Sequence, residues 1–467
     1  MIDPAALREQ IEASWRETVL PGLRDFIRIP NLSPAFDPEW ADNGLMEQAV
    51  EQVADWCRQR SIEGLSLEVL RLEGRTPLLW MEIEGESDHC VLFYGHLDKQ
   101  PPGEGWSAGK GPYEPVEEEG RLYGRGSVDD GYAVFTALAA AEAVQRQGGA
   151  LPRCLFLIEC SEESSSPDLE AYLRFLEGRL GKPDWVICLD SLMGDYQRLW
   201  CTTSLRGGVT GDLSVSLLKQ DCHSGLGSGV AASSFRVARM LLDRIEDSSS
   251  GNVLLPELHV DIPSLRVEEA SQTAQLLGEA LLRAIPLRPG VLPVSADATE
   301  LMLNNTWRAQ LSITGQRGMP PLERAGNMLR KETALKLSMR LPPTCDAVTA
   351  GKVLKRTLES DPPYGARVIF TITNSGQGWQ APPLEAKLER ALQEASQRFF
   401  GEPAAFLGVG GGIPVINMLA ERFPEAQMLV TGALGPDSNA HGPDESLHLE
   451  AARRLTCCLA WLLDRSR

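Results

Sequence analysis

The chain has 467 residues, of which 43% are hydrophobic and 23% charged, a globular composition long enough for two or three domains that excludes disorder and collagen-like repeats. Its 45 Lys and Arg stand against 64 Asp and Glu, a formal net charge of -19 at pH 7, and no basic cluster is present. We therefore expect neither nucleic acid nor an anionic membrane as a partner.

Helical and strand patterns alternate over the first 205 residues. Apolar residues at helical spacing predict two helices within residues 1–60. Short apolar runs predict four buried strands, at residues 77–83, 90–94, 154–158 and 185–189. Helical patterns at 131–147 and 168–179 separate the later strands. Strands that are apolar on both faces and alternate with helices indicate an α/β fold with a mostly parallel sheet.

The pattern changes after about Leu205. Residues alternate between apolar and polar in two segments, 212–217 and 335–341, which predicts strands with one face toward solvent. Helical segments at 231–245 and 346–358 accompany these strands. This block therefore has the pattern of a small α+β domain.

The α+β block is predicted to interrupt the α/β domain. A Gly- and Pro-rich stretch at residues 376–383 marks the return, and helices at 384–400 and 449–463 complete the first domain. The predicted organisation is an α/β domain in two parts with an inserted domain between them, with boundaries at residues 1–205, 206–377 and 378–467.

The cysteines and the chain start indicate the compartment. Ten cysteines are scattered without a C-x-x-C pair, and several lie in or beside apolar runs: Cys90, Cys154, Cys160 and Cys188. This usage predicts buried thiols in a reducing environment. No window reaches the roughly 18 apolar residues of a membrane span, and the first residues lack the apolar core of a signal peptide. We expect a cytoplasmic protein with no removed leader.

Acidic residues and a histidine follow three of the predicted buried strands. They are His96 and Asp98 after the second strand, Glu162 and Glu163 after the third, and Asp190 after the fourth. The carboxyl ends of parallel strands meet at one edge of a sheet, so these side chains are expected to converge. A glycine-rich turn at residues 124–131 brings Asp129 and Asp130 to the start of a helix.

Each of these motifs alone has an ordinary structural explanation. A histidine after a strand is more often a core or loop residue, paired aspartates before a helix are more often an N-cap, and paired glutamates usually lie in a solvated loop. Together, however, buried carboxylates would repel one another by roughly several kcal/mol unless a cation lies between them. Carboxylates with imidazoles favour zinc or manganese over calcium, and the number of ligands suggests two ions about 3.5 to 4 Å apart.

In their order and types, these residues resemble the aminoacylase and carnosinase type of co-catalytic zinc metallopeptidases, a family that includes glutamate carboxypeptidase, acetylornithine deacetylase and dipeptidases. The similar motifs run from Tyr94 to Glu445 and cover both expected domains. The resemblance implies a catalytic α/β domain with an inserted lid and dimerisation domain. It also implies two zinc ions per subunit, with manganese or cobalt as alternatives, and a homodimer that acts on small peptides or N-acyl amino acids.

The resemblance assigns a role to each candidate metal ligand. His96 and Asp190 would bind one metal, Glu163 and His441 would bind the second, and Asp129 would bridge the two. His441 is identified by its loop, Asn-Ala-His-Gly-Pro-Asp-Glu, which resembles the C-terminal histidine motif of the family. Outside that resemblance, it would be read as a solvated loop histidine.

The resemblance also implies residues that act on the substrate. Glu162 would be the general base, and Asp98 would hydrogen-bond the first metal's histidine and fix its tautomer. His223 stands in a motif resembling that of the family lid, where it would reach the partner subunit's site and stabilise the oxyanion. Arg340 is a candidate for binding the substrate carboxylate, with a surface salt bridge as the alternative.

Two departures from the family pattern affect the edge of the expected site. The family usually reads Asp-Asp-Lys-Gly at this turn, whereas here Asp129 and Asp130 are followed by Gly131 and Tyr132. Residues 408–414 read Gly-Val-Gly-Gly-Gly-Ile-Pro where dipeptidases of the family have Arg-Glu-Gly-Gly-Ser-Ile-Pro. The backbone amides of this turn, with Gly411 and Gly412 as the candidates, are still able to hold a carboxylate.

Three functions are consistent with this sequence. The leading hypothesis is a di-metal hydrolase of the dipeptidase or carboxypeptidase kind, which cleaves a peptide bond beside a free carboxylate. An N-acyl amino acid deacylase would use the same metals and base with a different pocket. A metal-free binding or assembly homologue is disfavoured, because every expected ligand or base position holds a competent residue.

Overall fold

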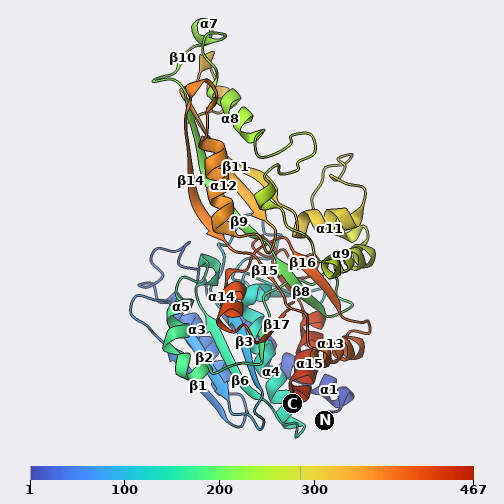
Figure 1. Cartoon of the computed structure of the whole chain (residues 1–467). Helices are drawn as coiled ribbons and strands as arrows, with labels where there is room; N and C mark the ends of the chain where they lie inside the picture. Colours follow the sequence, from blue (N-terminus) through green and yellow to red (C-terminus); the bar gives the residue numbers. More distant parts are fainter. Residues whose placement is uncertain (1, 284, 467) are drawn as a thin grey trace.

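A computed structural model of the chain describes residues 2–283 and 285–466. Figure 1 shows a broad lower body of helices around a large sheet and a narrow upper body that projects from it. Both chain ends lie in the lower body, so the chain leaves it and returns. The chain passes from the large sheet to the upper sheet at Arg206, between β8 (Trp200–Leu205) and β9 (Gly207–Ser216).

The lower body is built on a nine-stranded sheet in the order β1-β2-β6-β3-β7-β17-β8-β15, with β16 paired to β8. Besides β8, its strands are β1 (Leu65–Leu70), β2 (Leu78–Ile83), β3 (Cys90–His96), β6 (Arg153–Glu159), β7 (Trp185–Cys188), β15 (Trp379–Gln380), β16 (Ala405–Val409) and β17 (Gln427–Val430). β3 pairs in parallel with β6 and β7, and β17 in parallel with β7. Toward the edges, β1, β2 and β15 pair antiparallel. The predicted α/β class is confirmed.

Helices cover both faces of this sheet. On one face lie α1 (Pro4–Ser14), α2 (Leu20–Ile27), α3 (Leu45–Arg58), α4 (Tyr132–Arg146), α13 (Ala386–Phe399) and α15 (Leu449–Arg465). On the other lie α5 (Leu169–Phe175), α6 (Glu177–Leu180) and α14 (Pro414–Arg422). Along β3, Val91 and Phe93 pack into the first core and Leu92 and Tyr94 into the second. Burial of alternate residues on both faces explains why the strand reads as continuously apolar.

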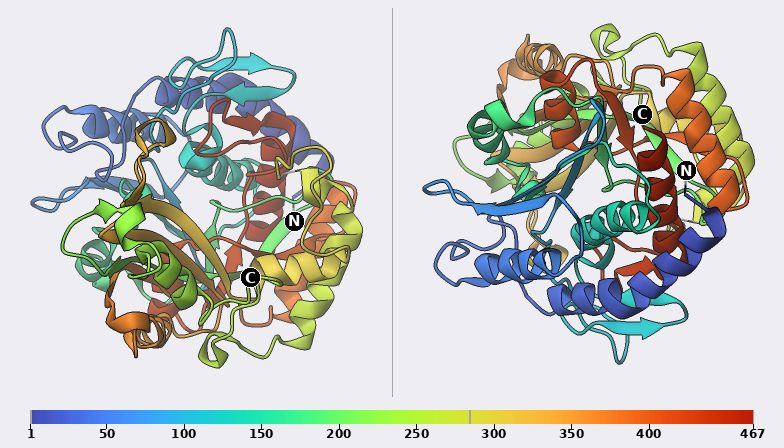
Figure 2. Two further views of the ribbon diagram at one scale, coloured as in Figure 1. Left: turned by 90° about the horizontal axis from the view of Figure 1, so that it is seen from above. Right: turned by 90° about the horizontal axis from the view of Figure 1, so that it is seen from below.

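The two ends of the chain are packed together in the lower body. Figure 2 shows α15 beside α1 and α4, and these helices contact one another. The indole Nε1 of Trp15 donates a hydrogen bond to Thr456 Oγ1 at 2.9 Å, within this core. All ten cysteines are among the described residues and are free thiols, and all except Cys222 are buried, as predicted. No helix within the described ranges is long and apolar enough to cross a membrane.

The upper body is an antiparallel sheet in the order β11-β13-β9-β14. Its elements besides β9 are β11 (Gln310–Arg317), β13 (Glu332–Leu341), β14 (Arg367–Gly376), α8 (Ser234–Leu242) and α12 (Ala347–Glu359). The predicted alternation on β13 is confirmed, because its apolar side chains are buried against α8 and α12: Leu335, Leu337, Met339 and Leu341. The intervening Arg340 is exposed on the opposite face.

Three small sets of elements complete the fold. β10 (Cys222–His223), α7 (Ser224–Gly227) and β12 (Met328–Leu329) form the tip of the upper body in Figure 1. β4 (Val116–Glu118), β5 (Arg121–Tyr123) and β18 (Ser446–His448) form a three-stranded sheet. The helices α9 (Ser264–Leu277), α10 (Ala280–Arg283) and α11 (Ala298–Thr306) were not predicted. α9 and α11 pack beside β16, where Thr273 Oγ1 donates to the Phe406 carbonyl at 3.0 Å.

The helix predicted at residues 168–179 is broken. It forms α5 and α6, which meet at Leu176, a residue whose φ of -88° and ψ of 3° lie outside the helical region. The apolar periodicity continues across the break because Leu173, Leu176 and Leu180 all enter the same core. Periodicity therefore reported the buried face correctly and missed the interruption of the backbone.

The first family departure has a steric cause at Gly131. A Cβ atom there would lie 2.3 Å from Phe26 Cε1 and 2.5 Å from the Gly126 carbonyl oxygen. The lysine usual in the family has no room here. We expect Gly131→Ala to lower the free energy of unfolding by about 1 to 3 kcal/mol through overpacking, measured by urea denaturation.

A matched control is Gly178→Ala on α6, where an added Cβ meets no atom within 4 Å. That change should be neutral or slightly stabilising, because alanine favours the helix. Equal stability of the two variants would show that Phe26 and the turn move aside at no cost.

Candidate metal centre

The strand order places the acidic motifs at one edge of the nine-stranded sheet. β3 lies between β6 and β7, and all three run parallel. β3 ends at His96, β6 is followed by a short 3-10 turn, Glu162–Ser164, and Asp190 follows β7 by two residues. Asp129 comes from the turn Ser127–Gly131 that precedes α4. Residues distant in the sequence therefore meet through the topology alone.

The first ligand group is His96, Asp129 and Asp190, all buried. His96 Nε2 lies 3.4 Å from Asp129 Oδ1 and 3.9 Å from Asp190 Oδ2. One potential ligand atom from each residue lies within 4.8 Å of the others. The group therefore has the spacing to hold one metal ion.

The second ligand group is Asp129, Glu163 and His441. His441 Nε2 lies 2.8 Å from Asp129 Oδ2 and 3.5 Å from Glu163 Oε1. Asp129 is common to both groups and presents a different carboxylate oxygen to each. One carboxylate is therefore positioned between the two candidate ion sites.

Two unpartnered atoms show that these residues fit metal ions. His96 Nε2 and Glu163 Oε1 are buried, and neither has a hydrogen-bond partner among the described residues. A buried polar atom without a partner is costly, and each of these atoms points at a ligand group. Three carboxylates and two imidazoles are a donor set that zinc, manganese and cobalt accept.

The protein groups by themselves hold protons at this centre. Burial, and then the charge of Asp129, raise the pKa of Asp190 to about 6 and that of Glu163 to about 8. Burial also raises the pKa of Glu162 well above its usual range. The hydrogen bond to Asp129 raises the pKa of His441 to about 9. Each raised pKa means that the group keeps a proton, which offsets the negative charge of the cluster. Divalent cations supply the same positive charge.

Asp98 supports both sides of the centre. Its carboxylate accepts hydrogen bonds from the backbone amides of Glu162 at 3.1 Å and Glu163 at 3.0 Å. His96 Nδ1 lies 3.1 Å from the Asp98 carbonyl oxygen and 3.4 Å from Oδ1. The nearest acceptor for the imidazole is therefore the main chain, and the carboxylate holds the glutamate turn, a contact that the sequence did not predict.

Sequence reasoning missed three residues that hold the candidate ligands in place. Gln100 Nε2 donates to Glu163 Oε2 at 2.6 Å, which leaves Oε1 for the ion site. Glu445 is fully buried, forms an ion pair with Arg125 at 2.5 Å, and accepts from the backbone amide of Gly126 at 2.9 Å. Arg125 lies in the glycine-rich turn at residues 124–131, and Glu445 ends the loop that carries His441. A charged residue in each of these two turns was a signal in the sequence that could have identified the pair.

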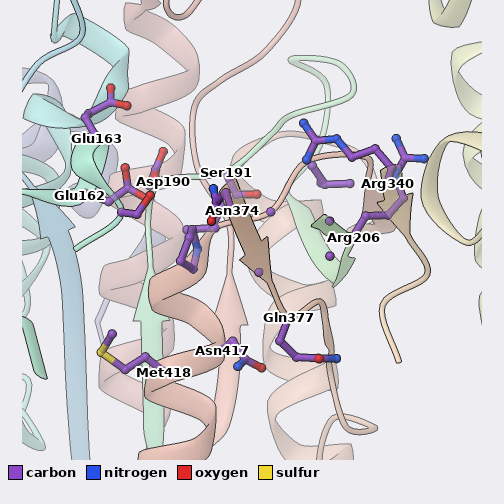
Figure 3. Close-up of a pocket in the computed structure, with 18 of the residues that line it drawn as sticks. Glu162, Glu163, Asp190, Ser191, Arg206, Arg340, Asn374, Gln377, Asn417 and Met418 are labelled. Carbon is purple, nitrogen blue, oxygen red and sulfur yellow. The ribbon is translucent and has the colours of Figure 1, made fainter. Parts of the chain in front are cut away.

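The ligands open into a cavity of about 790 Å³ (Figure 3). Glu162, Asp190 and His441 line it, and so do Arg340 and Gly412 from the sequence prediction. Gly411 is not among the lining residues, and its carbonyl accepts a hydrogen bond from the backbone amide of Arg206 at 3.0 Å. The cavity thus connects the candidate ion sites to Arg340 of β13.

His223, predicted to act on the substrate, lies far from the candidate metal centre of its own subunit. It is exposed at the tip of the upper body, far from the nine-stranded sheet in Figure 1, and it does not line the cavity. Its Nδ1 accepts a hydrogen bond from the Gly225 amide at 3.1 Å. Within its own subunit, His223 is not part of the centre.

A centre of three carboxylates and two imidazoles that opens into a cavity, with His441 half exposed at its edge, is typical of a metal-dependent hydrolase. Residues 92–465 match the family model described as Peptidase family M20/M25/M40. The chain belongs to this family. The predicted resemblance to co-catalytic metallopeptidases is therefore confirmed, and the protein is a metal-dependent peptidase.

Individual relatives cover most of the chain. The chain is 25% identical to the cysteinylglycine-S-conjugate dipeptidase of Corynebacterium striatum over 446 residues, which are 92% of each protein. It is 28% identical to the Beta-Ala-His dipeptidase of Homo sapiens, over 80% of this chain and 74% of that protein. The solved structure of an M20 family metallo-carboxypeptidase from Sulfolobus solfataricus has the same fold, with a TM-score of 0.80 and 18% identity over 96% of this chain and 99% of the other.

Metal removal should destabilise the protein more strongly as the pH rises. Without cations, Asp190, Glu163 and His441 have raised pKa values in the folded state, so the folded state binds more protons than the unfolded one. Its stability therefore falls as the pH rises from about 4 to about 9. Bound cations replace these protons, so the metal-loaded protein should lose little over that range.

The measurement is the difference in Tm between metal-loaded and chelator-treated protein at about pH 5.5 and about pH 8.5. We expect a larger difference at the higher pH. A difference that is constant or smaller at the higher pH would contradict the account of the centre.

Proposed function

We propose that this protein is a dipeptidase that uses two zinc ions per subunit, with manganese or cobalt as alternatives. The observation that carries the proposal is Asp129, whose two oxygens face two separate ligand groups at the end of a cavity. Relatives that match most of the chain are named as dipeptidases, which supports the same substrate class. In this proposal His96, Asp190 and Asp129 would hold one ion, and Glu163, His441 and the same Asp129 would hold the other.

Glu162 has the position of the general base. It lines the cavity near Glu163 and Asp190, yet belongs to neither ligand group. Two cations held by these residues would supply Lewis-acid polarisation of the peptide carbonyl and would lower the pKa of a water molecule. Glu162 then accepts a proton from the attacking water and passes it to the leaving amine as the carbon–nitrogen bond breaks. Its backbone amide donates a hydrogen bond to Asp98, which holds the main chain of this turn in place.

Arg340 is proposed to bind the free carboxylate of the dipeptide. It lines the same cavity, and its side chain forms no ion pair or hydrogen bond with any other described residue. A planar guanidinium suits bidentate pairing with a carboxylate. The backbone around Gly412 lines the cavity nearby and is proposed to contact the same end of the substrate, with Gly411 supporting that turn.

Residues 206–377 are proposed to act as a lid and dimerisation domain. The exposed tip carries His223 together with the apolar side chains of Leu226 and Val230, which are 76% and 86% exposed. Exposed apolar residues of this kind favour a protein interface. In a homodimer the tip would reach the partner's cavity, where His223 would donate a hydrogen bond to the oxyanion.

The compartment proposed is the cytoplasm. Its support is the set of ten free thiols, nearly all buried, which suits a reducing environment.

Metal analysis after reconstitution with zinc, manganese or cobalt identifies the preferred ion. A panel of dipeptides and N-acyl amino acids tests the substrate class, and activity confined to the N-acyl compounds would make the protein a deacylase.

Glu162→Gln should keep the metal content and lower kcat by roughly 10² to 10⁴, because the amide cannot accept the proton. Metal analysis and steady-state kinetics on one dipeptide provide the measurement. The matched change Glu163→Gln at the next residue should instead lower the metal content. The opposite pattern, metal loss in Glu162→Gln and metal retention in Glu163→Gln, would mean that the two roles are exchanged.

His223→Ala should lower kcat with little change in KM or metal content, because its contact forms mainly in the transition state. Mixing this variant with Glu162→Gln under subunit exchange tests action across the dimer. In mixed dimers one site carries both substitutions and the other neither, so activity should return toward half of the wild-type value. If exchange is demonstrated and no activity returns, His223 does not act in trans.

A further inference from the structure

The cavity has two oppositely charged ends. Figure 3 shows Glu162, Glu163 and Asp190 on one side and Arg206 and Arg340 on the other, and all five residues line the cavity. The acidic end faces the candidate ion sites, which would balance its charge. The basic end has no such compensation.

Arg206 is a buried guanidinium without a carboxylate partner. Only 7% of the residue is exposed. Nε donates to the Gly410 carbonyl at 3.0 Å, and Nη1 lies 3.4 Å from the carbonyl oxygens of Asn304 and Arg308. These acceptors are uncharged main-chain groups, and Nη2 donates to no group among the described residues. A buried cation held only by neutral groups favours an anion at its open nitrogen.

The groups around Arg206 do not supply that anion. Burial, and then the charge of Arg340, lower the pKa of Arg206 to about 10, and no acidic residue offsets them. Glu421 lines the same cavity from α14, but its Oε1 accepts a hydrogen bond from Asn417 Nδ2 at 2.9 Å, and it does not act on Arg206. The remaining polar side chains that line this end from the upper sheet and the residue after β14 are neutral: Thr210, Ser338, Asn374 and Gln377.

We propose that Arg206 and Arg340 together bind the two carboxylates of an acidic C-terminal residue, so that the preferred substrates are dipeptides ending in Asp or Glu. Arg340 would take the α-carboxylate, which every dipeptide carries, and Arg206 would take the side-chain carboxylate. This inference rests on the proposed dipeptidase function. It goes beyond hydrolysis itself, because it proposes that Arg206 determines which dipeptides are preferred.

The physical reason for the preference is the cost of leaving Arg206 unpaired. A neutral side chain such as Gln fills similar space but carries no charge. The Arg206 guanidinium then remains buried without an anionic partner of its own. A charge-assisted hydrogen bond in a buried site corresponds to roughly 10- to 100-fold in binding. We therefore expect kcat/KM for an acidic dipeptide to exceed that of its amide analogue by about this factor.

The test compares kcat/KM of the metal-loaded wild-type enzyme for Ala-Glu against Ala-Gln and for Ala-Asp against Ala-Asn. The acidic member of each pair should be preferred by about tenfold or more. Equal values for the two members would overturn this inference and leave the dipeptidase function standing. Hydrolysis of no dipeptide at all would overturn both.

The variant Arg206→Met locates the preference. Because Arg206 also holds the Gly410 turn, both substrates can lose rate, so the readout is the ratio of the two kcat/KM values. That ratio should fall to about one, and Arg206→Lys should keep part of it. The control is Arg317→Met on β11, an exposed guanidinium outside the cavity that lies 3.5 Å from Glu332. Arg317→Met should keep the wild-type ratio. If Arg206→Met also keeps the wild-type ratio, Arg206 does not determine the preference.

Discussion

Mutual repulsion among buried carboxylates is the constraint on which the rest of this structure depends. Asp129, Glu163 and Asp190 converge at one edge of the sheet, with Glu162 beside them and two imidazoles between them. Such a cluster is stable only where positive charge lies within it. Protons on groups with a raised pKa, such as Glu163 and His441, supply part of this positive charge. Divalent cations supply it better at neutral pH. The same charge that makes the site stable makes it chemically active.

The fold keeps these groups together by linking distant parts of the chain. The loop that carries His441 and the turn that carries Asp129 are joined by the buried pair of Arg125 and Glu445, which are 320 residues apart. Arg125 also donates to the Gly442 carbonyl at 2.9 Å, one residue beyond the ligand. A buried pair contributes little net stability, but loss of one partner leaves an unpaired charge. Its value here is therefore geometric, because it fixes Asp129 relative to His441.

Local pattern was enough to predict the strands that deliver the ligands. β3, β6 and β7 are apolar on both faces, so continuous apolar runs located them within one or two residues. The helices α9 to α11 were missed because they contribute only a few residues to a separate minor core, such as Ala270, Ala274 and Leu303, too few for a clear helical pattern. Arg206 was missed for a different reason: a single arginine between two strands has no local pattern, and its importance arises from groups that meet it only in three dimensions.

The central claim is that Asp129 bridges two cations, and metal stoichiometry tests it most directly. Wild-type protein reconstituted and freed of excess metal should contain about two ions per chain, and Asp129→Ala should lose both, because each ligand group includes this residue. Asp55→Ala, at an exposed surface carboxylate paired with Arg58, should keep two. An Asp129→Ala protein that is folded and retains two tightly bound ions would contradict the account.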